Sequence, residues 1–190
     1  MDNRDFFNKL AFQWDNMCKH DEEKLEKILN LSEVKENSNI LDVGTGTGVL
    51  IKYLLKTSPM KITAVDISEN MIEVAKSKYK GEKVEFIIKD INRYNDKNFD
   101  YIFLYSVYPH FKDKEATLRH LRKLLNKGGK IIIAHSDSKE KINKVHSRNE
   151  IVKEDKLPSV EVTARIMEKY VTIEKMIDNE NMYYISGVKV

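Results

Sequence analysis

Acidic side chains and a glycine-rich turn stand at the ends of short apolar runs. The run at residues 40–43 contains Asp42 and leads into residues 44–48, with sequence GTGTG. Glycine adopts positive φ and lets a ligand lie against the backbone because it has no Cβ. The helix expected at residues 49–55 would direct free N–H groups towards that ligand. This pattern indicates a site for a nucleotide-like ligand.

Two further carboxylates follow apolar runs. Asp66 ends the run at residues 61–66 and lies 20 residues after Gly46. Nucleotide-binding α/β folds place a carboxylate near this position, where it accepts hydrogen bonds from ribose hydroxyls. Asp90 follows the run at residues 84–88. Surface acids are common at strand ends, so each position taken alone is also compatible with no binding role.

Two histidines could accept a proton at the same edge of the sheet. His110 follows the apolar run at residues 99–105, and His135 ends the run at residues 130–135. Ligands of open α/β sheets bind outside the carboxyl ends of the strands. We therefore predict His110 and His135 as candidate general bases, because histidine titrates near neutral pH.

A metal site is a weaker hypothesis for the histidines. His20 and His146 would join His110 and His135 in such a site. The alternative is that the histidines are polar side chains satisfied by ordinary hydrogen bonds, as we expect for His120 in the middle of a helix. We expect no resident metal.

The elements that must position these residues follow from apolar periodicity. Strands separated by helices or crossovers predict a parallel sheet, and two later runs around residues 179–181 predict a hairpin. The helix that begins at Pro158 is expected to direct Val162, Ile166 and Met167 inward. The predicted strands are 40–43, 61–66, 84–88, 99–105, 130–135, 171–178 and 182–190, and the predicted helices are 4–17, 21–31, 49–55, 68–81, 113–126 and 138–148.

Residues 1–37 precede the first strand and are aromatic and acidic. The two helices expected there, 4–17 and 21–31, include Trp14 and several phenylalanines. One interpretation is ordinary core packing of these aromatic side chains. The other is a lid that closes over a ligand at the glycine turn.

Composition excludes several classes of protein. The chain of 190 residues is 41% apolar and 33% charged, which is typical of a soluble globular domain. Its net charge of +3 is spread over the chain, so we expect no nucleic-acid partner. The single cysteine excludes an internal disulfide. With no apolar run of about 20 residues and no signal-peptide pattern, we expect a cytoplasmic monomer or homodimer without membrane contact.

Taken in order, these motifs resemble those of the class I S-adenosylmethionine-dependent methyltransferases. Residues 41–48 resemble the family's first motif, an acid followed by G-x-G-x-G, and residues 64–67 and 89–91 resemble its second and third. Residues 124–133 resemble its turn from a helix into the fifth strand. A nicotinamide-binding turn reads G-x-G-x-x-G, with its third glycine one residue later. The pattern therefore favours the methyltransferases.

The resemblance implies a fold and a division of the chain. The fold would be α/β, Rossmann-like and doubly wound, with a mostly parallel seven-stranded sheet, a C-terminal antiparallel hairpin and N-terminal cap helices. Residues 1–190 would form a single domain. Its expected parts are cap helices at 1–37, a cofactor-binding core at 38–135, a substrate-side insertion at 136–157, and a final helix and hairpin at 158–190.

The resemblance also implies S-adenosylmethionine as cofactor and a role for each matching residue. Asp42 and the glycine turn would hold its methionine end, and Asp66 its ribose hydroxyls. Ile67 would pack on the adenine, Asp90 would accept from its exocyclic amine, and Tyr105 would line the path to the sulfonium. The implied cofactor-binding residues are Asp42, Gly44, Thr45, Gly46, Gly48, Asp66, Ile67, Asp90, Ile91 and Tyr105.

The expected reaction is an in-line methyl transfer to a small-molecule acceptor. Residues 106–110, with sequence SVYPH, differ from the Asn/Asp-Pro-Pro-Tyr of enzymes that methylate amino groups of bases or glutamine. The short insertion at 136–157 leaves little room for a macromolecular substrate. The alternative hypothesis is a non-catalytic protein on the same fold that binds S-adenosylmethionine or a metal.

Overall fold

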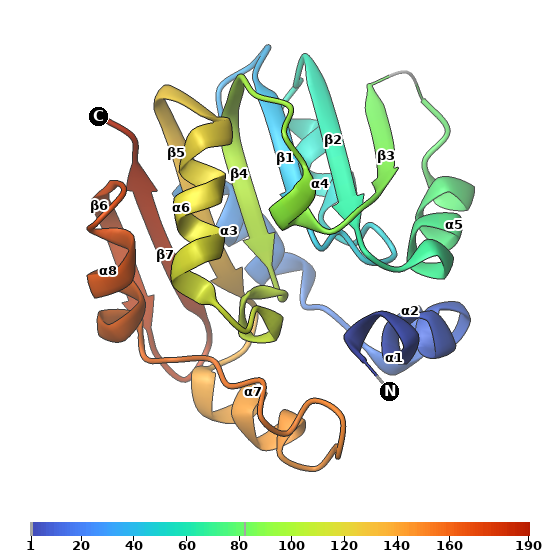
Figure 1. Ribbon diagram of the computed structural model, residues 1–190. Coiled ribbons are helices and arrows are strands. Elements are labelled where there is room, and N and C mark those ends of the chain that lie inside the picture. The colour runs from blue at the N-terminus through green and yellow to red at the C-terminus, as the bar shows by residue number, and fades with distance from the viewer. Residues whose placement is uncertain (1, 82) are drawn as a thin grey trace.

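The computed structural model describes residues 2–81 and 83–190. This part of the chain forms a seven-stranded sheet in the order β3-β2-β1-β4-β5-β7-β6, with helices on both faces (Figure 1). The first five strands are parallel, β7 is antiparallel to β5, and β6 is antiparallel to β7. The predicted fold class is confirmed. The strands are β1 (Asn39–Val43), β2 (Lys61–Asp66), β3 (Val84–Ile88), β4 (Phe99–Tyr105), β5 (Leu125–His135), β6 (Thr172–Asp178) and β7 (Tyr183–Val188).

The register of the sheet brings the carboxyl ends of the parallel strands to one edge. Val43 lies opposite Val65, Asp66 opposite Ile88, and Tyr105 opposite Ala134. The residue that follows each strand therefore emerges at the same side of the molecule. At this edge lie the glycine turn, both carboxylates predicted at the ends of β2 and β3, and the segment that carries His110.

Helices cover the two faces of the sheet because its central strands are apolar on both sides. On one face, α6 (Lys114–Leu124) and α8 (Val160–Met167) pack against the sheet. On the other face lie α3 (Glu22–Ser32) and α4 (Ile51–Lys56). Side chains alternate along β5, so that Ile131 and Ile133 join the first cluster and Ile132 and Ala134 the second. Most of the apolar core is divided between these two layers.

The N-terminal segment divides into a core helix and a covering layer. In α3, Leu25, Ile28 and Leu29 are buried, as ordinary core packing predicts. By contrast, α1 (Asn3–Leu10) has no buried residue. It lies with α2 (Trp14–Met17) beyond the carboxyl ends of the strands (Figure 1), linked to it by a 3-10 turn, Ala11–Gln13. Core packing is therefore confirmed for α3, while a lid formed by α1 and α2 stays a prediction.

Hydrogen bonds fasten α1 to α5 (Glu69–Lys78). Asn8 accepts at its side-chain oxygen from the Ser68 hydroxyl at 2.7 Å and from the Asn70 N–H at 3.0 Å. Ser68 also caps α5, because its hydroxyl accepts from the Met71 N–H at 3.1 Å. These contacts place the start of the chain directly over the edge where the strands end.

The remaining elements agree with expectation, apart from two details. The helix predicted to reach residue 126 ends at Leu124, because β5 begins at Leu125 and includes both glycines expected to close the helix. In α8 the buried positions are Val160, Thr163, Ala164 and Met167. The prediction that Val162 faces inward is wrong, since Val162 lies outside the helix face that these buried residues form and is 44% exposed. The other short helices are α7 (Lys139–His146) and the 3-10 turns Ile91–Arg93 and Tyr108–His110.

Among the described helices, none has the length and apolar character that a membrane crossing requires. A cytoplasmic location, a monomeric or homodimeric state and the single-domain division stay predictions from the sequence.

Candidate functional site

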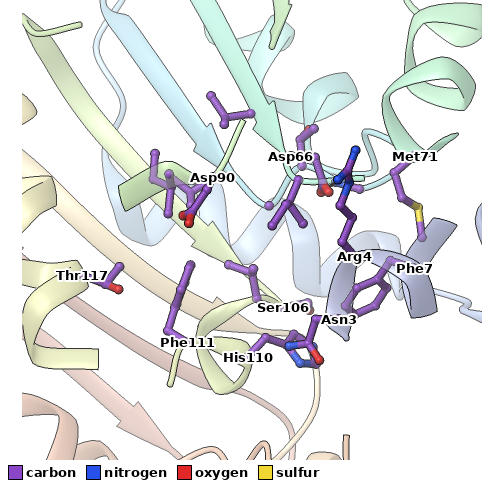
Figure 2. Close-up of a pocket in the computed structure, with 18 of the residues that line it drawn as sticks. Asn3, Arg4, Phe7, Asp66, Met71, Asp90, Ser106, His110, Phe111 and Thr117 are labelled. Atoms are coloured by element: carbon purple, nitrogen blue, oxygen red, sulfur yellow. Dashed lines mark hydrogen bonds between the residues drawn. The ribbon is translucent and has the colours of Figure 1, made fainter. Parts of the chain in front are cut away.

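A cavity of about 1150 Å³ lies at the edge where the parallel strands end. Its wall includes the glycine turn after β1, Asp66 at the end of β2, Asp90 after β3 and Ser106 after β4. Figure 2 shows Asp66, Asp90, Ser106 and His110 around one space, with Phe7 of α1 closing it from the N-terminal segment. Small-molecule sites typically measure about 300–1000 Å³. The cavity therefore has room for a nucleotide-sized cofactor and a second molecule.

The backbone of the glycine turn faces this cavity. The N–H groups of Gly44 and Thr45 donate to the Val65 carbonyl at 2.8 and 3.1 Å, which fixes the turn against β2. Gly46 has a φ of +56°, and a Cβ there would meet no atom within 4 Å. Gly44 has a φ of +66°, and a Cβ there would lie 2.3 Å from Cγ2 of Val107. The turn is thus packed tightly from behind at Gly44 and open to a ligand at Gly46.

The Asp66 side chain lines the cavity, and its carboxylate can accept further hydrogen bonds. Its Oδ2 accepts from the Gly46 N–H and its Oδ1 from the Ser68 N–H, both at 2.8 Å. Each carboxylate oxygen can accept a second hydrogen bond. Burial raises the pKa of Asp66, and the backbone N–H groups oppose that rise. This geometry suits two ligand hydroxyls, which is the role that the sequence resemblance implies.

Other predicted cofactor-binding residues also line the cavity. Ile67 is 40% exposed and supplies an apolar surface beside Asp66. The Asp90 side chain accepts from the Asn92 N–H at 2.9 Å and so holds the start of the turn at Ile91. Tyr105 is buried, and its hydroxyl donates to Ser136 Oγ at 2.8 Å. Burial first of all raises the pKa of Tyr105 to about 12, so this phenol keeps its proton at neutral pH.

Two predicted residues, Asp42 and Gly48, do not line the cavity. Asp42 is 2% exposed and accepts from the Thr45 hydroxyl at 2.6 Å. Burial raises the pKa of Asp42 to about 7, the Thr45 hydrogen bond opposes this, and the Asp66 charge adds to it. At Gly48, a Cβ would lie 2.9 Å from the Tyr79 ring. Asp42 and Gly48 therefore shape the turn, and neither takes the position for cofactor contact that the resemblance implied for both.

His110 forms an ion-pair-like contact that the sequence did not indicate. Its Nδ1 lies 2.7 Å from Asp155 Oδ2. A carboxylate only accepts hydrogen bonds, so Nδ1 carries a proton and donates it. Burial acts to raise the pKa of Asp155, but hydrogen bonding and charge, chiefly from His110, outweigh it and hold that pKa below its ordinary value. The described residues offer no hydrogen-bond partner to Nε2 of His110, whose side chain is 14% exposed.

His135 does not take the position predicted for it. Its side chain is 2% exposed, packs edge-on against Tyr183 at 5.9 Å between ring centroids, and lies outside the cavity wall. Burial, followed by the charges of His110 and His146, lowers the pKa of His135 to about 3. Its Nε2 is buried without a partner. The prediction that His135 acts as a base at the cavity is therefore wrong, since a ligand there cannot reach it.

The four histidines do not come together as a metal site. His20 lies on the cavity wall, with its Nδ1 2.7 Å from the Tyr105 hydroxyl. His146 stacks near His110, with ring centroids 5.1 Å apart, and its Nδ1 donates to the Asp155 carbonyl at 2.5 Å. Over residues 2–81 and 83–190, no group of three or more His, Cys, Asp or Glu side chains could hold a metal ion. The metal hypothesis for His20, His110, His135 and His146 has no support in this geometry.

Two segments far apart in the chain complete the wall. From the N-terminal segment, Phe7 contacts the rings of His110 and Trp14, at centroid distances of 5.1 and 5.5 Å. Asp155 comes from an irregular stretch of residues 151–157. Sequence reasoning placed residues 136–157 on the substrate side but did not identify Asp155. Irregular backbone carries no periodicity that could have indicated it.

Comparisons with known proteins identify the family of the chain. A family model described as "Methyltransferase domain" matches residues 34–185. Malonyl-[acyl-carrier protein] O-methyltransferase 1 of Ilyobacter polytropus is 31% identical over 189 residues, which cover 95% of this chain and 66% of that relative. Phosphoethanolamine N-methyltransferase 3 of Arabidopsis thaliana is 32% identical over 115 residues, which cover 58% of this chain and 24% of that relative. The chain thus spans less than two thirds of the length of either relative.

Solved structures share the fold over the whole chain. A putative methyltransferase in complex with the Trm112 methyltransferase activator of Haloferax volcanii superposes with a TM-score of 0.82 at 16% identity, covering 100% of this chain and 98% of that one. A SAM-dependent methyltransferase from Aquifex aeolicus superposes with a TM-score of 0.73 at 20% identity, covering 100% of both chains. At these identities the likeness concerns the fold alone.

We predict that His135 makes folding sensitive to acid. Its folded-state pKa lies below the ordinary 6.5, so the unfolded chain takes up a proton that the folded chain does not. The contribution of His135 to the free energy of unfolding is complete above about pH 7 and is lost towards pH 3. About 2 kcal/mol of it is lost between pH 7 and pH 5. Urea unfolding of the native chain and of His135→Phe should show this loss in the difference between their free energies of unfolding.

The difference between the two proteins is the informative quantity, because Asp42 titrates with the opposite sign. Its pKa is raised, so its contribution to stability falls as the pH rises from about 4 to 7. That contribution is common to both proteins and cancels. Parallel stability curves for the native chain and the variant would contradict the role assigned to His135.

We also predict that Gly46→Ala weakens binding of S-adenosylmethionine by about tenfold or more, equivalent to about 1.4 kcal/mol. The substitution puts a methyl group into the open side of the turn and a side chain at a φ of +56°. Gly81→Ala is the matched control, because a Cβ there also meets no atom within 4 Å but the backbone is not left-handed. Calorimetric titration of both variants measures the effect. Equal affinities would show that the ligand does not lie against Gly46.

Proposed function

The chain belongs to the class I S-adenosylmethionine-dependent methyltransferases, and from this premise we propose that it methylates a small-molecule acceptor. The observation that carries the proposal is the pairing of His110 with Asp155 inside the cavity that begins at the glycine turn. A ligand site and a proton acceptor thus share one space. The cavity is walled by the N-terminal segment and by residues 151–155, which supports a small acceptor.

The cofactor would occupy the part of the cavity between the glycine turn and Asp90. We assign Gly46 to backbone contact with it, Asp66 to its ribose hydroxyls, Ile67 to the adenine face and Asp90 to the adenine amine. The open side of Gly46 and the free accepting capacity of Asp66 support these roles. Thr45 and Ile91 lie on the same wall. When bound, S-adenosylmethionine supplies a methyl group on a positively charged sulfur atom.

The chain's own contribution to the chemistry is the orientation of His110. Asp155 accepts from Nδ1 and so fixes the ring and the tautomer, which leaves the Nε2 lone pair free to take a proton. Asn3 also donates to Asp155 Oδ2 at 3.3 Å, which ties the start of the chain to this pair. The Phe7 ring packs against His110 and limits its rotation. These contacts support His110 as a general base for the acceptor.

The relatives do not agree on an acceptor. Their names give an O-methyltransferase of malonyl-[acyl-carrier protein], an N-methyltransferase of phosphoethanolamine and a demethylmenaquinone methyltransferase. The acceptor of this chain is therefore better inferred from the groups that line its own cavity.

We expect His110→Ala to lower kcat by about 10²- to 10⁴-fold, which is the usual contribution of a general base. Affinity for S-adenosylmethionine should stay within about twofold, because His110 lies beyond the part of the cavity assigned to the cofactor. Imidazole added to this variant should restore part of the rate, as it would not for a residue with a purely structural role. Methyl transfer from radiolabelled cofactor measures these rates.

His120→Ala is the matched control. His120 is hydrogen-bonded to the Tyr94 carbonyl at 2.7 Å and lies outside the cavity wall. It should keep the native rate. Full activity of His110→Ala would remove His110 from the mechanism.

A further inference from the structure

The cavity has two halves of different chemical character. The cofactor half is bordered by Gly46, Asp66 and Asp90. The acceptor half is bordered by Asp2, Phe7, His110, Glu154 and Asp155. In Figure 2, Asn3, Phe7 and His110 gather on one side of the space, while Asp90 and Thr117 lie across it.

Two carboxylates of the acceptor half form no ion pair with a lysine or an arginine in the described part of the chain. The three carboxylates of this half are Asp2, Glu154 and Asp155. Asp2 accepts from the Asp5 N–H at 2.9 Å, and neither Asp2 nor Glu154 takes part in an ion pair within the described part of the chain. Asp155 is paired with His110. A ligand that enters this half therefore meets a negative potential.

Most cationic side chains on the cavity wall either pair with another residue or lie outside the acceptor half. Arg4 forms two hydrogen bonds with Glu69, one of them from Nε to Oε2 at 3.1 Å. Lys89 and Arg93 flank Asp90, in the cofactor half. Lys112 stands between Phe111 and the start of α6. Lys114, outside the cavity wall, donates through Nζ to the Pro109 and Phe111 carbonyls. A carboxylate acceptor would meet Asp2 and Glu154 in this half, and like charges juxtaposed in a site are unfavourable.

Aromatic rings complete the acceptor half. Phe7 and Trp14 both line the cavity and stand edge to face, with centroids 5.5 Å apart. Aromatic faces attract ammonium ions, and more strongly where water is excluded. The same rings suit an N-methylated product, because the methyl groups spread the positive charge over an apolar surface.

From this combination we infer that the acceptor is an amine, which binds as its ammonium ion against Asp2 and Glu154 with its nitrogen directed at His110. The inference rests on the proposed function and names its substrate class. It favours a different acceptor from the one in the name of the Ilyobacter polytropus relative, a malonyl-[acyl-carrier protein] O-methyltransferase.

The chemistry balances with the groups present. The ammonium ion has no lone pair, so one N–H bond must break first, and its proton goes to Nε2 of His110. The nitrogen lone pair then forms the new N–C bond as the C–S bond breaks, and the electron pair of that bond stays on sulfur. The methylated amine leaves as a cation, and His110 returns its proton to solvent. Asp155 stabilises the protonated ring in between.

The test compares amines with acids of matched skeleton on the full chain saturated with S-adenosylhomocysteine. Calorimetry would measure 2-phenylethylamine against 3-phenylpropanoate and butylamine against butanoate. Methyl transfer from labelled S-adenosylmethionine would then be measured with the same four compounds. We expect amines to bind about tenfold or more tightly than the acids and the amines alone to be methylated.

Two variants test which side chains bind the amine. The double variant Asp2→Asn, Glu154→Gln should weaken amine binding by about fivefold and leave binding of S-adenosylhomocysteine unchanged. Asparagine still caps α1 at position 2. Glu150→Gln is the control, because Glu150 lies nearby on the same stretch, pairs with Lys153 at 2.7 Å and stands outside the cavity. It should behave as the native chain.

The other outcomes distinguish failure of the proposed function from failure of the amine inference. No binding of S-adenosylhomocysteine would contradict the proposed function itself. Binding of S-adenosylhomocysteine together with a preference for the acids, or with no binding of either amine, would overturn the amine inference alone. Amine affinity that is unchanged in the double variant would overturn it as well.

Discussion

The close packing of the glycine turn against its neighbours is the constraint on which the site depends. Gly44 lies where a Cβ would collide with Val107, and its N–H is held by the Val65 carbonyl. This contact fixes the turn between β2 and the segment that follows β4. Gly46 can then donate to Asp66 while its open side faces the cavity. A side chain at Gly44 would separate elements that must meet, and one at Gly46 would occupy the space left open to a ligand.

The sheet places the cavity, and segments outside the sheet supply the half that is proposed to bind the acceptor. Parallel strands bring their carboxyl ends to one edge, which accounts for Asp66 and Asp90. The acceptor half comes from the start of the chain and from an irregular stretch around Asp155. One fold can therefore keep the same cofactor site while its acceptor changes, in line with the different acceptors named for the relatives.

Much of the architecture was predictable from the sequence, because apolar periodicity and glycine positions report directly on strands and turns. Asp66 was found through its spacing from Gly46, and the structure joins the two by a hydrogen bond. His135 was misplaced because β5 is buried on both faces, so that its sequence does not reveal which face a side chain takes. Asp155 was missed because its contact with His110 joins residues 45 positions apart through irregular backbone.

The most direct test of the central claim is calorimetric titration of the native chain with S-adenosylmethionine, S-adenosylhomocysteine and NAD. A turn that is open at Gly46, followed by Asp66 with free accepting capacity, predicts micromolar binding of both sulfur compounds and none of NAD. Binding of NAD without either sulfur compound would contradict the account, and the glycine turn would then belong to a different nucleotide.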